Sequence, residues 1–556
     1  MEVLLNISTL VLYKKASSKN LIMTTITATV TGKNYIGNKL SAKGSVTNKT
    51  FNPQLNIENE CDFYEATLEE VDEAVELAHQ AFKEYRNLSG ARKAEFLDAI
   101  ADEILALDDT LIQMYTSESG LPEGRAMGER GRTVFQLRTF AELVREGSWK
   151  KNVIDTANPT REPFPKPDIR RINIPLGPVV VFAASNFPLA FSTAGGDTAS
   201  ALAAGCPVIV KSHSMHAGTG ELVASAIIKA AEKTGMPNGV FSNIAGSGRV
   251  VGAALVKHPK VKAVGFTGSI GGGRALFNLA ANREEPIPVF AEMGSINPVI
   301  ITPASIANKS EEIATTYAGS ITLGTGQFCT NPGLILTIDD ANTQSFIKDL
   351  GEKATAIAPQ CMLHPNIKRD FVKNGESVSS QEGVEIISKI DDSNVEANYA
   401  PTQIASVSGK EFLANPKLHQ EVFGPFSLVV KAKDQEELVD VINCLEGQLT
   451  GTIIAEPSDY ENLSDVVNAL QNRVGRIILN GVPTGVEVTE AMTHGGPYPA
   501  SSDSRFSAVG VNSINRWVRP FSFQGFPDEL LPEELKNENP LNVTRTIDGQ
   551  LTKETI

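Results

Sequence analysis

One short stretch of the chain combines a single cysteine with the residues of a tight turn. Residues 324–333 read Gly-Thr-Gly-Gln-Phe-Cys-Thr-Asn-Pro-Gly, with the thiol at Cys329. Glycine lets the backbone approach a ligand closely, and Asn-Pro-Gly bends the chain sharply. A thiol on such a turn can be presented to a substrate, with backbone N–H groups facing it. The alternative for this window alone is a buried cysteine that packs as a small hydrophobe.

Two other side chains have the types that thiol chemistry needs. Glu292 closes the apolar run that begins at Ile287, and a carboxylate in an apolar pocket has a raised pKa and can act as a general base. Asn186 follows another apolar run, and its amide N–H can stabilise an oxyanion. The structural alternatives are a partly exposed carboxylate at a strand end and an Asn turn before Pro188.

Several predicted strand ends carry residues that are typical of a nucleotide site. Gly268 and Ser269 follow one such strand and Gly273 comes five residues after Gly268, so free N–H groups at a helix start can meet a pyrophosphate. The spacing is neither GxGxxG nor a P-loop. Lys211 ends another strand and can bond sugar hydroxyls or a phosphate, with a solvated lysine as the alternative. Glu421 precedes a further strand and can bind a ribose diol.

Strand and helix alternate around these residues. Four helices are expected between Thr67, which starts the capping box Thr67-Leu68-Glu69-Glu70, and Gly147. Buried strands are then predicted at 177–184, 207–211, 240–244 and 261–266, with helices at 193–204 and 217–234. This order predicts a doubly wound parallel α/β sheet, whose ligands bind at the carboxyl ends of the strands.

A second alternating region is expected to start at 287–300. Its predicted helices are at about 309–324, 343–357 and 435–445, and its predicted strands are at 334–338, 422–430, 450–455 and 475–480. The Pro-rich segment 151–172 indicates an excursion from the main fold or a hairpin. The tail 529–556 is expected to wrap the surface.

Composition excludes several classes of function. With 556 residues, two or three domains are expected, and the net charge of −15 argues against nucleic acid or an anionic membrane as partner. The five cysteines are scattered without a CxxC, so neither disulfides nor a metal site are predicted, and a cytoplasmic location is expected. Residues 1–23 are interpreted as a disordered extension, or as an upstream start before Met23, because their apolar run is too short to span a bilayer and has no small-residue cleavage site.

Taken together and in this order, these segments resemble the aldehyde dehydrogenase superfamily over about residues 35–525. The motifs are Asn186-Phe187-Pro188-Leu189, Lys211, Gly265–Ser269, Glu292-Met293-Gly294, Gly326-Gln327-Phe328-Cys329 and Glu421-Val422-Phe423-Gly424-Pro425. The resemblance implies three parts in a homodimer or homotetramer. They are a nicotinamide-cofactor domain (24–150 and 173–290), a catalytic domain (291–510) and an oligomerisation hairpin (151–172 and 511–528).

The resemblance also implies a role for each catalytic residue. Cys329 is the nucleophile, Glu292 is the base, and Asn186 forms the oxyanion hole with the backbone N–H of Cys329. Thiolate attack on an aldehyde gives a thiohemiacetal, and loss of hydride to the nicotinamide gives a thioester. Water activated by Glu292 then releases the acid.

The implied cofactor is NADP or NAD. The residues expected to bind it are Lys211 at the adenosine ribose, Ser269 with Gly268 and Gly273 at the pyrophosphate, Glu421 at the nicotinamide ribose and Phe423 against the nicotinamide. NAD-strict members usually carry Glu three residues after the lysine, where this chain has Ser214. Because Arg249 can meet a 2′-phosphate, NADP is expected to be accepted alongside NAD.

Finer features are similar to the branch that acts on 2-oxoglutarate semialdehyde (2,5-dioxopentanoate). They include residues 326–333, the triplet Ile296-Asn297-Pro298 and the run His494-Gly495-Gly496-Pro497-Tyr498-Pro499. That substrate carries a carboxylate remote from its aldehyde, and arginine is a bidentate partner for a carboxylate. The expected substrate-binding residues are Arg132 first, Arg138 second, and Phe187.

Three alternatives stay open at this stage. One is a dehydrogenase of medium- or long-chain aliphatic aldehydes, and another is a non-catalytic protein that retains the fold. A reductive, CoA-acylating role is a lesser option. For either arginine, the alternative is a surface or interdomain salt bridge.

Overall fold

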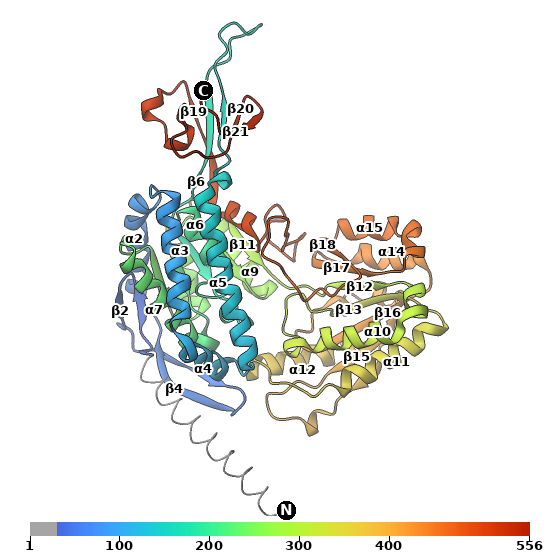
Figure 1. Ribbon diagram of the computed structural model, residues 1–556. Coiled ribbons are helices and arrows are strands. Elements are labelled where there is room, and N and C mark those ends of the chain that lie inside the picture. Colours follow the sequence, from blue (N-terminus) through green and yellow to red (C-terminus); the bar gives the residue numbers. More distant parts are fainter. Residues whose placement is uncertain (1–29) are drawn as a thin grey trace, which may run out of the picture.

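A computed structural model describes residues 30–556 of the chain (Figure 1). The predicted extension, residues 1–23, lies outside the described residues. Two seven-stranded sheets lie side by side, and a five-stranded sheet projects from the first of them and carries the C-terminus (Figure 1). A two-stranded ribbon, β3 (Thr47–Asn52) with β4 (Ile57–Tyr64), completes the strands.

The first sheet is the predicted doubly wound sheet. Its order is β11 (Val289–Glu292), β10 (Ala263–Thr267), β7 (Val179–Phe182), β8 (Val208–Lys211), β9 (Phe241–Ile244), β1 (Asn34–Ile36) and β2 (Lys39–Ser41). The strands from β11 to β9 are parallel, and β1 is antiparallel to β9. The chain extends from β7 to β8 and β9 on one side and later adds β10 and β11 on the other. That reversal between β7 and β10 opens a crevice at their carboxyl ends, where ligands of such sheets bind.

Helices cover both faces of this sheet (Figure 1). They are α2 (Leu68–Tyr85), α3 (Gly90–Leu105), α4 (Asp108–Ser119), α5 (Glu123–Glu146), α6 (Gly196–Ala204), α7 (Ala217–Lys233), α8 (Ala253–Lys257) and α9 (Ile270–Ala281). The capping box at Thr67 is present, since its side chain accepts from the Glu70 N–H while the Glu70 carboxylate accepts from the Thr67 N–H. Helix α6 starts three residues later than predicted, because Gly195 closes a turn onto the Ser192 carbonyl.

The second sheet is parallel except at one edge. Its order is β14 (Glu385–Lys389), β15 (Gln403–Ser408), β16 (Phe426–Ala432), β13 (Leu334–Ile338), β12 (Pro298–Ile301), β17 (Gln448–Ile454) and β18 (Val474–Leu479). Its helices are α10 (Pro303–Thr322), α11 (Ala341–Ala356), α12 (Pro365–Ser379), α13 (Gly409–Ala414), α14 (Gln435–Cys444) and α15 (Ser464–Gln471). The sequence did not predict the elements between 365 and 414.

Three expectations for this region differ from the structure. The strand expected from 422 begins at Phe426, because Pro425 has no N–H to donate to the sheet. The helix expected from about 309 begins at Pro303. The strand that ends at Glu292 belongs to the first sheet, where Val264 pairs with Val289 in register. The boundary predicted at 290/291 therefore moves to the link between β11 and β12.

The projecting sheet contains more of the chain than predicted. Its order is β19 (Val518–Gln524), β6 (Ile169–Pro175), β5 (Val153–Asp155), β20 (Arg545–Ile547) and β21 (Gln550–Thr552). The tail expected to wrap the surface supplies β20 and β21, held by buried Arg545, which donates to the Lys536 and Glu554 carbonyls. Residues 511–517, expected in the hairpin, form a 3₁₀ turn whose Trp517 packs into the core of the first sheet.

Four apolar clusters fill the two faces of the two large sheets, and a fifth lies under the projecting sheet. Within residues 30–556, no helix has the length and apolar character needed to cross a membrane.

Candidate active site

Cys329 lies on a turn whose backbone shape depends on glycine. The turn follows η4 (Leu323–Gly326), where Gly326 has φ +64°, in the left-handed region that disfavours side chains. A Cβ at Gly326 would come within 2.2 Å of the Gly424 carbonyl carbon. On the other side, the Asn297 amide donates to the Cys329 carbonyl at 2.8 Å. The backbone of the thiol is thus fixed from two sides, while its side chain stays partly exposed.

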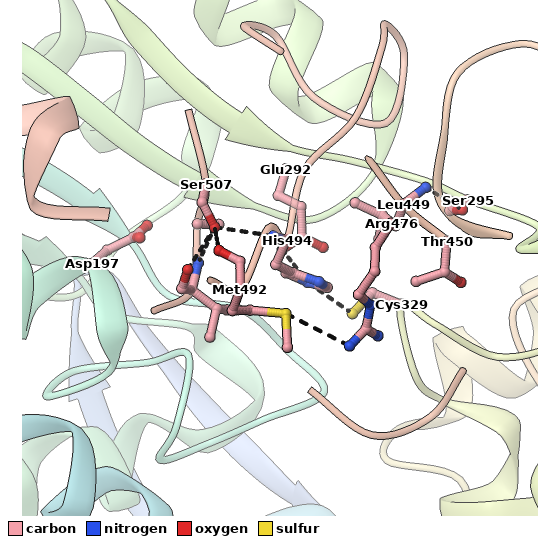
Figure 2. Close-up of polar contacts among 12 residues, drawn as sticks. Asp197, Glu292, Ser295, Cys329, Leu449, Thr450, Arg476, Met492, His494 and Ser507 are labelled. Atoms are coloured by element: carbon pink, nitrogen blue, oxygen red, sulfur yellow. Dashed lines mark hydrogen bonds and ion pairs between the residues drawn. The ribbon is translucent and has the colours of Figure 1, made fainter. Parts of the chain in front are cut away.

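The thiol, an imidazole and a carboxylate meet in one small space (Figure 2). The Cys329 Sγ lies 3.6 Å from the His494 Nε2, and that nitrogen lies 2.9 Å from the Glu292 Oε2. The side chains of Glu292 and His494 are only 3% and 1% exposed. Burial, and after it the charge of Glu292, raises the pKa of the Cys329 thiol well above its usual value. The resting group is therefore a neutral thiol that needs a proton acceptor.

His494 is held in place by the segment that follows it. Ser502 donates its N–H to the Ala291 carbonyl at 2.9 Å, which fixes this segment along β11. The His494 N–H donates to the Ser507 Oγ at 3.0 Å (Figure 2). Sequence reasoning quoted His494 only as part of a motif and assigned it no role. A histidine before Gly-Gly-Pro was the available signal, but its contact with the thiol depends on packing across 165 residues.

Asn186 comes to the same place from the end of β7. Its Nδ2 donates to the Gln327 carbonyl at 3.1 Å, two residues before the thiol. The neighbouring Phe187 ring packs edge-on against Phe328 at 5.3 Å. The structure therefore brings Asn186, Glu292 and Cys329 from three distant segments to one cleft.

A cavity of about 380 Å³ opens in front of the thiol and contains Arg132 in its wall. One Arg132 nitrogen, Nη1, donates to the Val486 carbonyl. The other two, Nε and Nη2, are buried and have no hydrogen-bond partner among the described residues. Burial lowers the pKa of Arg132, but a guanidinium stays charged at neutral pH. A buried cation with free donors is the feature that a carboxylate ligand needs.

Arg138 does not line this cavity. Its side chain is 52% exposed and pairs with Asp102 at 3.1 Å on the outer face of α5. The prediction of Arg138 as a substrate residue is therefore not supported by its place in the fold. The reason is helical geometry, since residues 132 and 138 are six apart and project from different faces of α5.

Two further arginines lie near the thiol, and no sequence motif pointed to either of them. Arg125 stacks on Phe187 at 4.4 Å and on Phe328 at 4.6 Å, in the wall of the cavity. Arg476, on β18, donates to the Gly485 carbonyl at 2.9 Å. Burial lowers the pKa of Arg476, and the negative form of Cys329 acts in the opposite direction. Figure 2 draws Arg476 together with the thiol.

A larger cavity, about 1710 Å³, lies between α8 and α9 at the carboxyl end of the first sheet. Arg249 lines it from a π-helical turn, η3 (Gly248–Gly252). Ser269 caps α9, its hydroxyl accepting from the Gly272 N–H at 3.2 Å, and Gly268 donates its N–H to the Glu292 carbonyl. Gly273 has no room for a side chain, since a Cβ would meet the Met293 sulfur at 2.6 Å.

The remaining predicted cofactor residues occupy neighbouring strand ends and loops. Lys211 ends β8, and burial lowers its pKa to about 8. Ser214 is exposed at the start of the next turn. Glu421 and Phe423 lie in the loop before β16. Burial raises the pKa of Glu421 to about 7, and a Cβ on Gly294 would approach its carboxylate to 2.8 Å.

Comparison with known proteins assigns this arrangement to a family. The model of the aldehyde dehydrogenase family matches residues 41–512. The chain is 48% identical to alpha-ketoglutaric semialdehyde dehydrogenase 2 of Azospirillum brasilense, over 94% of this chain and 99% of that protein. It is 45% identical to an alpha-ketoglutaric semialdehyde dehydrogenase of Acinetobacter baylyi, over 88% and 93%. The chain belongs to the aldehyde dehydrogenase family.

Solved structures agree with the aldehyde dehydrogenase fold. The betaine aldehyde dehydrogenase of Staphylococcus aureus, crystallised in complex with NAD⁺, superposes with a TM-score of 0.78 at 19% identity, covering 92% of this chain and 98% of that one. The aldehyde dehydrogenase KauB of Pseudomonas aeruginosa gives a TM-score of 0.76 at 21% identity. The resemblance and the α/β fold class predicted from the sequence are thereby confirmed.

Proposed function

We propose that this aldehyde dehydrogenase oxidises 2-oxoglutarate semialdehyde to 2-oxoglutarate with NADP or NAD. The observation that carries the substrate is Arg132. It is a half-buried arginine in the wall of the cavity that contains the Cys329 thiol, and its Nε and Nη2 have no hydrogen-bond partner among the described residues. A substrate with an aldehyde at one end and a carboxylate at the other can satisfy both groups at once. The names of the two relatives at 48% and 45% identity support the same substrate.

In the proposed first step, the thiol must lose its proton before it attacks. His494 accepts that proton at Nε2, 3.6 Å from the sulfur, and the resulting imidazolium is stabilised by the Glu292 Oε2 at 2.9 Å. The thiolate attacks the aldehyde carbon, and the oxyanion accepts hydrogen bonds from the Asn186 amide and the Cys329 backbone N–H. Because the thiol proton moves to His494 in this step, Glu292 remains available as a base.

The nicotinamide, when bound, accepts the hydride. Lys211 would hold the adenosine ribose, Ser269 the pyrophosphate and Glu421 the nicotinamide ribose. Hydride loss leaves a thioester on Cys329. Glu292 then accepts a proton from the water that attacks the thioester, the C–S bond breaks and the acid leaves. The Cys329 thiolate takes back the proton held by His494, and Glu292 loses its proton to solvent. The neutral residue at 214 and the cation at 249 in the larger cavity favour acceptance of NADP as well as NAD.

The test compares two arginines on one helix. Arg132→Met removes the proposed carboxylate partner, and Arg138→Met removes an exposed arginine of the same helix, six residues away. We expect Arg132→Met to lower kcat/KM for 2-oxoglutarate semialdehyde by about 100-fold, as loss of a charge-assisted bidentate contact implies, and to spare hexanal. Arg138→Met should leave both substrates unchanged. Equal losses on hexanal and the semialdehyde would contradict the assignment.

A second candidate is a dehydrogenase of medium- or long-chain aliphatic aldehydes. The rings of Phe187, Phe191 and Phe328 in the cavity wall favour it. The same experiment separates the two candidate functions, because an aliphatic aldehyde has no carboxylate for Arg132 to bind. A wild-type preference for hexanal would favour the second candidate.

We further infer that the subunit assembles into a homodimer or homotetramer through the projecting sheet. Phe521 is exposed on the edge strand β19 and makes a T-shaped contact with Phe523, with the ring centroids 5.0 Å apart. Exposed aromatic residues on an edge strand are typical of a contact surface. Light scattering after gel filtration measures the assembly, and a monomeric mass would refute this inference.

A further inference from the structure

We propose that Cys329, His494 and Glu292 together bind a divalent cation of borderline softness, Zn²⁺ in particular, and that the bound ion reversibly blocks the enzyme. The three residues offer a sulfur, an imidazole nitrogen and a carboxylate oxygen, all within 4.8 Å of one another. These are the three ligand types that zinc takes from proteins. Nothing in the proposed catalytic cycle uses a metal.

The separations fit a tetrahedral ion closely. With Zn–S of about 2.3 Å and Zn–N of about 2.0–2.1 Å, tetrahedral angles place the two ligand atoms roughly 3.6 Å apart. The Cys329 Sγ and the His494 Nε2 are 3.6 Å apart. The nitrogen and the Glu292 Oε2 are 2.9 Å apart, so the carboxylate must retreat by about 0.5 Å to reach a tetrahedral position.

The carboxylate is free to make that movement. Neither Glu292 oxygen accepts a hydrogen bond from a backbone N–H among residues 30–556, and the carboxylate contacts only the other two members of the site, His494 at 2.9 Å and the Cys329 thiol. Its side chain is 3% exposed and that of His494 is 1% exposed, so both groups point into the protein rather than into solvent. A buried carboxylate without backbone donors gains from a cation, because the ion replaces the solvation that burial removed.

The chemistry balances without a further reactant. When Zn²⁺ binds, the S–H bond of Cys329 breaks, a Zn–S bond forms and one proton leaves to solvent. His494 coordinates in its neutral form through Nε2. Because Cys329 lines the cavity of about 380 Å³, water from that cavity can complete the shell and the ion can exchange.

Blocking of the reaction rests on the proposed function, since the ion occupies the sulfur that attacks the aldehyde. Binding of the ion does not rest on it. Metal and aldehyde therefore compete, and a chelator restores activity.

A second group of potential ligands provides the control. Asp72, Glu76 and His258 also lie within 4.8 Å of one another, but at the surface and without a thiol. Lys260 already pairs with Glu76 there. This group carries no proposal of its own.

The experiment uses the full-length enzyme without cofactor. Co²⁺ is titrated as the spectroscopic probe and Zn²⁺ as its competitor, and thiolate-to-cobalt charge-transfer absorption reports coordination by sulfur. We expect one ion per subunit and displacement of Co²⁺ by Zn²⁺. His494→Gln should weaken binding about ten-fold or more, since it removes one of three protein ligands. Cys329→Ser should abolish the band, and His258→Gln should change neither. Circular dichroism verifies that each variant is folded.

The outcomes separate this proposal from the proposed function. Absence of the charge-transfer band, or equal affinity in wild type and His494→Gln, would show adventitious surface binding and overturn the site. A band without oxidation of any aldehyde would leave the metal site standing and refute the proposed function. Wild-type oxidation of hexanal or the semialdehyde that zinc leaves unchanged, or zinc inhibition that a chelator does not reverse, would overturn the blocking role.

Discussion

The Cys329 thiol is surrounded by groups with opposing effects on its charge. Burial and the Glu292 carboxylate raise its pKa, whereas the guanidinium groups of Arg132 and Arg476 favour its anionic form. A thiol that stays protonated at rest is protected from oxidation, because the thiolate is the reactive species. In the proposed first step, His494 removes this proton when an aldehyde is present.

This balance predicts how the thiol titrates. A raised pKa means that the thiolate fraction, and hence the alkylation rate of Cys329, rises about ten-fold per pH unit through pH 9, where an ordinary thiol with pKa of about 8.5 levels off. Glu292→Gln removes a negative charge, lowers the thiol pKa and should speed alkylation at pH 8. Iodoacetamide labelling followed by mass spectrometry reads Cys329 separately from the other cysteines. A slower reaction in Glu292→Gln would contradict the electrostatic account.

Arg249 predicts a second measurable difference. If it meets the 2′-phosphate of NADP, Arg249→Ala should lower kcat/KM for NADP about ten-fold, as loss of one exposed charge-assisted contact implies, and leave NAD within two-fold. NAD is the internal control, because it lacks the phosphate. Strict NAD preference in the wild type, or equal losses with both cofactors, would refute the expectation drawn from Ser214 and Arg249.

The turn that carries Cys329 shows how an element can be specified by the absence of a side chain. Gly326 approaches the Gly424 backbone so closely that the two segments contact each other through main-chain atoms, with no room for a side chain between them. On the far side, Asn297 bonds to the Cys329 carbonyl. The position of the sulfur therefore depends on the packing of elements from 297 to 424.

Gly326→Ala tests this dependence. The left-handed backbone costs about 1–2 kcal/mol for a side chain, and the clash with Gly424 adds to that. We expect a lower melting temperature together with loss of activity, because the turn must shift. Gly319→Ala is the matched control, since a Cβ there meets nothing within 4 Å and a helical alanine should stabilise by about 0.5–1 kcal/mol. Unchanged melting in Gly326→Ala would refute the packing argument.

Across the whole molecule, local signals predicted elements well and long-range pairing poorly. Strand β13 has the predicted bounds, because an apolar run defines it, and Gly120 ends helix α4, one of the four helices expected before Gly147. The sheet to which β11 belongs could not be read locally, since a strand's partners lie far away in sequence. The same limit applied to His494, whose role comes from one contact with Cys329. For Cys329 and Glu292, the other two members of that site, the family motifs supplied the roles that local sequence signals could not.

The tail is the clearest case in which long-range strand pairing could not be predicted from local sequence. Its Pro- and Glu-rich composition contains no local signal for β20 and β21. Arg170, on β6, is 6% exposed and donates to the Leu535 carbonyl and, at 2.8 Å, to the Asn537 Oδ1. A buried guanidinium without acceptors is costly. The projecting sheet is therefore expected to need the tail for its stability.

Removal of residues 529–556 tests that expectation. It strips β20 from β5 and leaves Arg170 without two acceptors, so amide exchange in residues 153–155 and 169–175 should accelerate by an order of magnitude or more. The values of kcat and KM per folded subunit should change little, because the catalytic cleft lies outside the projecting sheet. The oligomeric mass should fall if the projecting sheet forms the subunit contact. Leu551→Ala, at a side chain 76% exposed, is the control and should exchange as wild type does. Unchanged exchange after truncation would mean that the hairpin of β5, β6 and β19 holds Arg170 by itself, with Asp168 as its sufficient partner at 3.0 Å.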